Sequence, residues 1–364
     1  MGALTAVRFF AAFQVVLFHI WAFQGLTRAP VWLQTFARTG FTGVTFFFVL
    51  SGFIFVYTYA GKPLNLGSFW RARLARLYPV YLLSLLVSAP LFFSPEFTKN
   101  IAEQAWAVKH MSLTVVLVVT MMQAWLPGTA LGWNEVNWSV SVEIFFYSMF
   151  PWLLARIRRF TNRGLLLIGT ASWVTSLAIA ILYVVISSDG RGPTSADNTL
   201  IGLNILKFNP LSRLPEFLLG LACGSWFVRG EHNTKTATPL VLLGMAGVLG
   251  TIAFSASIPY AVMTTGLMAP AFAAIICGLA LRPRWIAWLE RPWLVLLGEA
   301  SYGLYLLHGL VLLSGFYLIS PDPSGVPGSG RVLVSGFVAI LLSVFVFRFI
   351  DEPLRRRLRG TRPA

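Results

Sequence analysis

The chain has 364 residues, of which 57% are apolar and only 11% are charged, and its mean hydropathy is +0.73. A water-soluble domain carries roughly a quarter charged residues, so this composition excludes a soluble globular protein. The net charge of +15 does not indicate nucleic-acid binding, because the basic residues form short clusters between apolar runs and no continuous stripe. Clusters placed in this way are typical of the cytoplasmic loops of a membrane protein.

Apolar runs of roughly 17–25 residues predict transmembrane helices. We expect them at residues 5–24, 41–60, 78–94, 138–155, 164–187, 211–228, 238–256, 262–281, 296–319 and 331–350. The predicted fold is therefore all-α, a polytopic membrane protein with about ten transmembrane helices. No appended soluble domain is expected, so residues 1–364 should form a single membrane-embedded domain.

The basic clusters also predict the orientation, because loops rich in lysine and arginine stay on the cytoplasmic side. The arginines at 355–357 place the C-terminus there, and we expect the N-terminus on the same side. The same counting places Arg76 on the cytoplasmic side and Asn137 on the outer side, so the chain must cross an odd number of times between them. Two apolar runs, 78–94 and 112–125, lie in that interval, so one of them cannot cross completely. We expect the shorter run, or the stretch before it, to be re-entrant or interfacial, with a cavity near residues 95–137 to cover it.

Two ionisable side chains lie inside predicted spans, where such groups are costly and often functional. His19 follows Arg8 by eleven residues, which is a rise of about 16 Å, or half of a bilayer. Glu143 lies five residues inside its span, and His19 is about as deep in its own. This matched depth predicts that His19 is a general base and that the Glu143 carboxylate orients it. The structural alternatives are a histidine bonded to a neighbouring helix and an ion pair between helices.

A basic cluster with a neighbouring tyrosine lies at the predicted cytoplasmic edge, about half a bilayer below His19. Its members are Arg8, Arg71, Arg73, Arg76 and Tyr78. Arginine binds phosphates through paired hydrogen bonds. Coenzyme A carries phosphates at one end and its thioester at the end of a pantetheine arm about as long as the Arg8–His19 separation. The cluster therefore fits a cytosolic acyl-CoA donor that reaches a membrane-embedded base, and the alternative is a set of ordinary topology-determining charges.

Four further residues are candidates to line a substrate cavity, namely Ser51, Trp138, Ser139 and His308. His308 lies in the middle of its span and is equally compatible with a structural role. Ser51 lies in a segment rich in small and aromatic residues, which also suits close helix packing. The two cysteines lie singly in apolar runs, so we expect neither a disulfide nor a metal site.

Together these residues resemble the membrane acyltransferase family 3, and the resemblance covers nearly the whole chain. It rests on six segments in family order: Arg8 with His19, Gly43–Phe53, Arg73–Pro79, Trp138–Tyr147, Ser301–His308 and Glu352–Pro353. Each segment alone is a weak signal, and their order makes the match specific. Val140 is a small departure, because the family usually has leucine at that position.

The resemblance implies an acyl-CoA-dependent O-acyltransferase of the bacterial plasma (inner) membrane. It implies that His19 is the catalytic base, that Glu143 orients it, and that the basic cluster holds the phosphates of acyl-CoA. The acyl group, which we expect to be acetyl, passes to the acceptor directly or through a covalent intermediate.

The expected acceptor is a sugar hydroxyl of a surface polysaccharide or lipid-linked glycan, and the alternative is a macrolide or another small natural product. From a different class, a glycolipid transporter or flippase also buries ions in broken helices, but the two halves of this chain show no inverted repeat.

Overall fold

The computed structural model describes residues 1–24, 26, 29–94, 105–187, 201–230, 233–318 and 329–359. Within these ranges the regular structure is helical and contains no strand, which confirms the predicted all-α class. The long helices are α1 (Gly2–Gln24), α3 (Gly43–Tyr59), α4 (Leu66–Phe92), α8 (Trp138–Ile157), α9 (Asn162–Ile186), α11 (Pro210–Val228), α12 (Ala237–Ala253), α14 (Ala269–Ala280), α15 (Pro292–Leu318) and α16 (Ser329–Val346). The shorter ones are α2 (Val31–Arg38), α6 (Ala105–Lys109), α7 (Met111–Val119), α10 (Ile201–Phe208), α13 (Tyr260–Thr264) and α17 (Glu352–Arg359).

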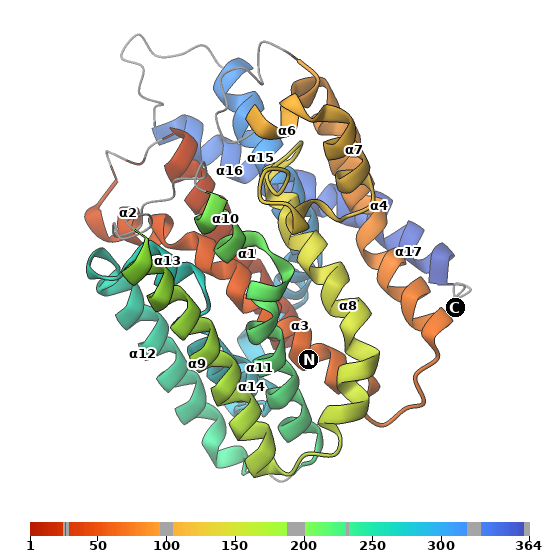
Figure 1. Ribbon diagram of the computed structural model, residues 1–364, viewed down its shortest axis with the longest axis vertical. Helices are drawn as coiled ribbons and strands as arrows, with labels where there is room; N and C mark the ends of the chain where they lie inside the picture. The colour runs from red at the N-terminus through yellow and green to blue at the C-terminus, as the bar shows by residue number, and fades with distance from the viewer. Residues whose placement is uncertain are drawn as a thin grey trace.

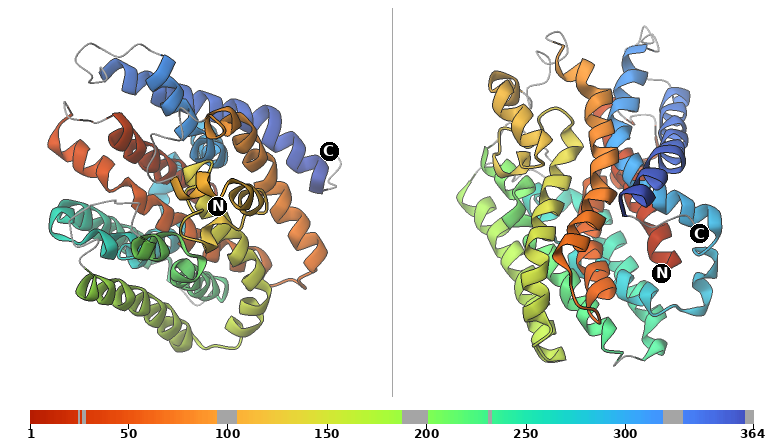
Figure 2. Two further views of the ribbon diagram at one scale, coloured as in Figure 1. Left: turned by 45° about the horizontal axis from the view of Figure 1, so that its top comes forward. Right: turned by 90° about the vertical axis from the view of Figure 1, so that its right-hand side faces the viewer.

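The long helices form one bundle whose two ends differ. In Figure 1 the short helices α2, α6, α7 and α10 gather at the upper end, whereas α8, α9, α11 and α12 turn at the lower end. Figure 2 shows α9 and α12 on one side of the bundle and α4 and α17 on the other. A π-helical turn at Phe347–Asp351 connects α16 to α17.

Nine segments of the described chain are long and apolar enough to cross a membrane. The predicted span 211–228 corresponds to α11, which is not one of the nine because Arg213 and Glu216 lower its mean hydropathy. Its 19 residues nevertheless give about 28 Å, close to the thickness of the hydrocarbon core. The ten predicted spans thus correspond to the nine segments and α11.

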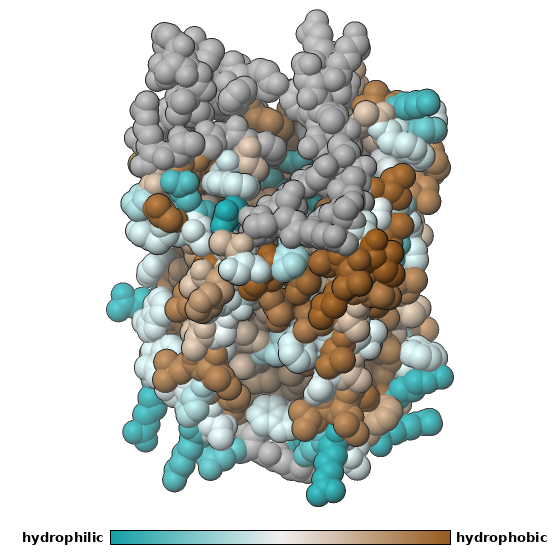
Figure 3. All heavy atoms as spheres, turned by 60° about the vertical axis from the view of Figure 1, so that its left-hand side comes forward, coloured by the Kyte–Doolittle hydropathy of each residue, from teal (hydrophilic) through white to brown (hydrophobic). Residues whose placement is uncertain are grey.

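The outer surface of the bundle is apolar, as a lipid-facing surface must be. Leu166 of α9 and Leu243 of α12, for example, are 71% and 69% exposed. Figure 3 shows apolar side chains across the middle of one face and hydrophilic side chains at its lower end. The chain is therefore a multi-pass membrane protein.

Helix α4 begins at Leu66, twelve residues before the predicted span 78–94. The Asn65 side chain caps this earlier start by accepting a hydrogen bond of 2.9 Å from the backbone N–H of Ser68. The arginines of residues 71–76 consequently lie on a helix, so their side chains point in different directions around its axis.

The predicted span 262–281 is also different, because it divides into α13 and α14. Gly266 lies between the two helices with a φ of +85°, a conformation that favours glycine and interrupts an α-helix. Backbone carbonyls at the break, including that of Thr264, are thereby released from helical hydrogen bonding and can accept bonds from side chains.

Of the two apolar runs before residue 138, Ser112–Trp125 is the one whose helix is too short to cross. Its helix α7 has nine residues, about 14 Å, which is less than half of the hydrocarbon core. Met121 follows with a positive φ of 57° and turns the chain. The Tyr81 hydroxyl of α4 donates a hydrogen bond of 2.6 Å to the Val118 carbonyl at the end of α7. α4 itself has 27 residues, which is more than a crossing requires.

Helices α3 and α11 approach each other closely in the centre of the bundle. A Cβ atom at Gly220 would lie 2.0 Å from the Val49 carbonyl oxygen, and one at Gly52 would lie 2.3 Å from the Phe217 carbonyl oxygen. Only glycine permits this separation, as in other membrane interfaces built from small residues.

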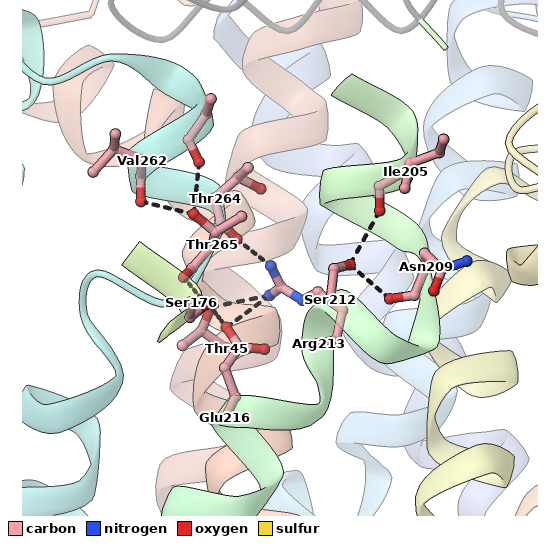
Figure 4. Close-up of polar contacts among 11 residues, drawn as sticks. Thr45, Ser176, Ile205, Asn209, Ser212, Arg213, Glu216, Val262, Thr264 and Thr265 are labelled. Atoms are coloured by element: carbon pink, nitrogen blue, oxygen red, sulfur yellow. Dashed lines mark hydrogen bonds and ion pairs between the residues drawn. The ribbon is translucent and has the colours of Figure 1, made fainter. Parts of the chain in front are cut away.

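A buried ion pair reinforces this contact. Arg213 and Glu216 of α11 lie 3.0 Å apart, and each side chain is 2% exposed. Thr45 of α3 donates a hydrogen bond of 2.7 Å to Glu216 and accepts one of 3.1 Å from Arg213. Arg213 also donates to the Thr264 carbonyl at the α13–α14 break, as Figure 4 shows. One guanidinium thus connects α11, α3 and the broken helix.

Removing one partner of this pair should destabilise the fold. We expect Glu216→Leu to lower the free energy of unfolding by about 3–5 kcal/mol, because Arg213 then stays buried without its counter-ion. The double variant Arg213→Leu/Glu216→Leu should recover most of the loss. Arg282→Ala, at a pair with Glu290 that is 65% and 24% exposed, is the matched control and should cost less than about 1 kcal/mol. Unfolding in detergent micelles measures all of them, and equal losses in the single and double variants would contradict the pairing.

Cysteine accessibility tests the course of α7. In a background with both native cysteines replaced by alanine, Lys109→Cys and Leu126→Cys, which flank α7, should react with an impermeant maleimide from one side of the membrane. Lys62→Cys and Ser94→Cys, which flank α4, should react from opposite sides. Labelling of the α7 pair from opposite sides would show that this segment crosses.

Candidate functional site

The larger of two adjacent cavities, about 220 Å³, lies among α1, α3, α4, α8 and α15. Its polar lining residues are Thr5, Arg8, Ser51, Arg76, Ser139, Glu143, Tyr147, Ser301, Tyr302 and Tyr305. The volume is below the roughly 300–1,000 Å³ of sites that enclose a whole small molecule. It suits the narrow arm of a ligand whose bulky end stays outside.

The charges in the larger cavity favour an anionic ligand. Arg8 of α1 is within electrostatic range of Arg76 and Glu143. The Tyr147 hydroxyl donates a hydrogen bond of 2.6 Å to Glu143. Two guanidinium groups therefore face one carboxylate, which leaves the lining with an excess of positive charge.

The predicted basic cluster is only partly brought together. Arg8 and Arg76 line the larger cavity. Arg71 and Tyr78 are exposed on α4, and neither lines this cavity. The helical course of α4 from Leu66 explains the difference, because it turns these side chains to a different face from that of Arg76.

Arg73 has a different environment from the one predicted, since it is only 7% exposed. Its guanidinium lies 5.1 Å from the ring centre of Phe55 and 5.7–5.9 Å from those of Tyr59, Phe69 and Tyr147. It also donates a hydrogen bond of 3.3 Å to the Tyr59 hydroxyl. The cation is held by aromatic faces from α3, α4 and α8. Two of these rings, Phe55 and Tyr147, line the larger cavity, but Arg73 itself does not.

The second cavity, about 80 Å³, contains His19. Val44 and Tyr305 line both cavities and form the wall between them. Glu135 and Val136 also line the smaller cavity, in the region where the short run before residue 138 predicts one. Residues 95–104 of that region lie outside the described ranges.

The lining of the smaller cavity combines aromatic rings with charged groups. The rings are those of Trp138, Phe208 and Tyr260, and the charged groups belong to Glu135, Lys207 and Arg213. The Lys207 ammonium lies 4.7 Å from the ring centre of Phe208 and 5.2 Å from that of Tyr260.

His19 and Glu143 lie in different cavities, so the predicted orienting contact is not formed. Nδ1 of His19 is 3.0 Å from Nε2 of His308, whereas Glu143 bonds Tyr147. Depth along a helix does not determine the direction around its axis, and α1 packs on α15, which carries His308. A Cβ atom at Gly298 of α15 would lie 1.9 Å from the Thr5 carbonyl oxygen of α1, which shows how close the two helices are.

The predicted substrate-cavity residues divide among three places. Ser51 and Ser139 line the larger cavity, and Trp138 lines the smaller one. His308 is fully buried against His19 and lines neither cavity. Lys207 was not among the predicted site residues, because residues 188–210 lie between two predicted spans. The apolar spacing within Ile201–Phe208 was the available signal for a short helix there.

Comparison with known proteins gives a family match and several relatives. Residues 1–348 match the family described as acyltransferase domain. The chain is 28% identical to acyltransferase MdmB of Streptomyces mycarofaciens over 388 aligned residues, which cover 100% of this chain and 94% of that protein. It is 24% identical to O-acetyltransferase OatA of Staphylococcus aureus over 98% of this chain and 57% of OatA. No solved structure matches.

The sequence left two classes open, an acyltransferase and a glycolipid transporter or flippase, and these similarities decide between them. Both relatives carry acyltransferase names, and neither is named as a transporter. The family match covers the residues that line both cavities. The chain therefore belongs to the acyltransferase domain family, the membrane acyltransferase family 3 that its motifs resemble, and it is a membrane-embedded acyltransferase.

Proposed function

We propose that the protein transfers a short acyl group, in the first place acetyl, from acyl-CoA to a sugar hydroxyl of a surface polysaccharide or lipid-linked glycan. The observation that carries the proposal is the pair of adjacent cavities. One contains the two arginines and the other contains His19, with Val44 and Tyr305 in the wall between them. The O-acetyltransferase name of OatA supports both the acetyl group and the hydroxyl acceptor.

Acyl-CoA would occupy the larger cavity with its pantetheine arm. Its phosphates would bind Arg8 and Arg76 through charge-assisted hydrogen bonds. Arg8 and His19 are eleven residues apart on α1, about 16 Å, so the arm can extend from the arginines to the wall. The thioester would then lie beside Val44 and Tyr305, and His19 would lie on the other side of the wall that these two residues form.

His19 would act as the general base in the smaller cavity. Its unprotonated ring nitrogen takes the proton of the acceptor hydroxyl, and the oxygen attacks the thioester carbonyl carbon. The carbon–sulfur bond of the tetrahedral intermediate then breaks, and the CoA thiolate leaves. The thiolate takes up the proton that His19 holds. The products are the acyl ester and CoA with a free thiol, so each atom and charge is accounted for.

The smaller cavity supports a sugar as the acceptor. The apolar C–H faces of a sugar ring pack against aromatic rings such as Trp138 and Tyr260, while its hydroxyls bind charged groups such as Glu135 and Lys207. With about 80 Å³, the cavity holds one hydroxyl-bearing group at a time. The rest of a glycan would extend beyond it.

The basic clusters support a bacterial plasma membrane location with both termini in the cytoplasm. The larger cavity, which Met1 lines, then opens toward the cytosolic pool of acyl-CoA. The smaller cavity lies deeper, toward the outer side, where lipid-linked glycans and surface polysaccharides are exposed.

The variant His19→Ala tests the proposed general base. Purified protein is given radiolabelled acetyl-CoA and a panel of lipid-linked sugars, polysaccharides and macrolides. Mass spectrometry identifies the acetylated product. We expect about a 10²–10⁴-fold loss of transfer, the usual contribution of a general base. His110→Ala is the matched control, because His110 stacks on Trp106 and lines neither cavity. Full activity of His19→Ala would refute the mechanism. An acetylated macrolide as the product would show that the acceptor is a macrolide and not a glycan.

Arg76, which lines the larger cavity, should contribute more to acetyl-CoA binding than its exposed neighbour Arg71. We expect Arg76→Ala to raise the KM for acetyl-CoA about 10–100-fold, because a hydrogen bond to a charged group contributes about 1.5–3 kcal/mol. Arg71→Ala, five residues earlier on the same helix, should change KM less than about threefold. Steady-state kinetics with acetyl-CoA as the varied substrate measures both. A larger effect at Arg71 than at Arg76 would place the donor elsewhere.

A further inference from the structure

His308 is a buried histidine whose ring contacts that of His19. It lies on α15 with no exposed surface. Its ring centre is 4.8 Å from that of His19, and the two ring planes are inclined by 59°. The tilted rings meet through nitrogen atoms, with Nε2 of His308 3.0 Å from Nδ1 of His19.

The partners of each nitrogen assign the protons. A carbonyl oxygen can only accept, so Nδ1 of His308, which is 3.1 Å from the Leu304 carbonyl oxygen, carries the proton of the neutral ring. Nε2 of His308 is then an acceptor. Nδ1 of His19 lies between this nitrogen and the Val15 carbonyl oxygen, each 3.0 Å away. Two acceptors at one nitrogen require it to donate, so neutral His19 is protonated at Nδ1.

We infer that His308 is the positioning residue of the catalytic base and not a substrate-binding residue. It holds His19 in the tautomer whose Nε2 is unprotonated and basic, and it fixes the direction in which that nitrogen points. This inference rests on the proposed function, in which His19 takes the proton of the acceptor hydroxyl.

The pair also provides for the charge that forms during the reaction. When Nε2 of His19 takes up a proton, its Nδ1–H bond to neutral His308 becomes charge-assisted and therefore stronger. In a serine hydrolase a carboxylate does this for the catalytic histidine. Here the role that the sequence indicated for Glu143 falls to an uncharged imidazole, which costs less to bury inside a membrane bundle than a carboxylate does.

Two variants of similar size separate positioning from packing. The side-chain oxygen of His308→Gln can reach the place of Nε2 and accept from His19, whereas His308→Leu has no acceptor. CoA release from acetyl-CoA is measured with water and methyl β-D-glucopyranoside as probe acceptors. We expect His308→Gln to remain within about tenfold of the native kcat and His308→Leu to lose at least about 100-fold. The KM for acetyl-CoA should be unchanged in both.

The combination with His19→Ala gives a second readout. Residues that act as one unit show non-additive losses. His19→Ala/His308→Leu should therefore be no slower than His19→Ala alone. Equal losses in His308→Gln and His308→Leu, or additive losses in the double variant, would overturn the inference.

A spectroscopic test does not depend on turnover or on the variants folding. In protein labelled with ¹⁵N-histidine and reconstituted in nanodiscs, the ring nitrogen shifts report which of the four histidines is protonated at which nitrogen. At neutral pH we expect His19 and His308 both protonated at Nδ1, with a cross peak between the Nδ1 proton of His19 and Nε2 of His308. Protonation of His19 at Nε2 would overturn the inference. Absence of CoA release from the native protein would count against the proposed function instead, and the tautomer measurement would still decide this one.

Discussion

An ionisable group inside a lipid-facing bundle has no water to solvate it, so the protein must supply its partner. Three such groups among the described residues show how this requirement is met. Arg213 has Glu216 and Thr45, Arg73 has a set of aromatic rings, and His19 has a second histidine. The close contacts of α3 with α11 and of α1 with α15, both made at glycines, bring Thr45 to Arg213 and His308 to His19. The packing of the helices and the chemistry of the cavities therefore depend on the same constraint.

Much of the fold could be predicted because lipid imposes a simple rule on sequence. Long apolar runs must be helices, and the parity of crossings identified one run that fails to cross, which is the segment of α7. Helix breaks were harder to predict. The predicted span 262–281 divides into α13 and α14 because of one positive φ at Gly266, and no change in hydropathy marks that position. The early start of α4 was likewise missed, because glycine, serine and three arginines interrupt the apolar run in its first turns.

The candidate site was predictable in its residue types and depths but not in its pairings. Spacing along α1 separates Arg8 from His19, and the two side chains line different cavities. It could not show that His19 faces α15 and not α8, because azimuth depends on how neighbouring helices pack. The same limit explains why Arg73 and Arg76, three residues apart, have separate environments. Motif order added what spacing lacked, and the family match over residues 1–348 agrees with it.

The central claim is that the larger cavity holds the arm of acyl-CoA and presents its thioester to His19. A cryo-electron microscopy map of the protein in nanodiscs with a non-hydrolysable acetyl-CoA analogue tests this most directly. We expect phosphate density beside Arg8 and Arg76, a pantetheine arm in the larger cavity, and an acyl group beside Val44 and Tyr305. A map in which the analogue binds elsewhere, or in which a lipid tail fills the cavity while the analogue is bound, would contradict it.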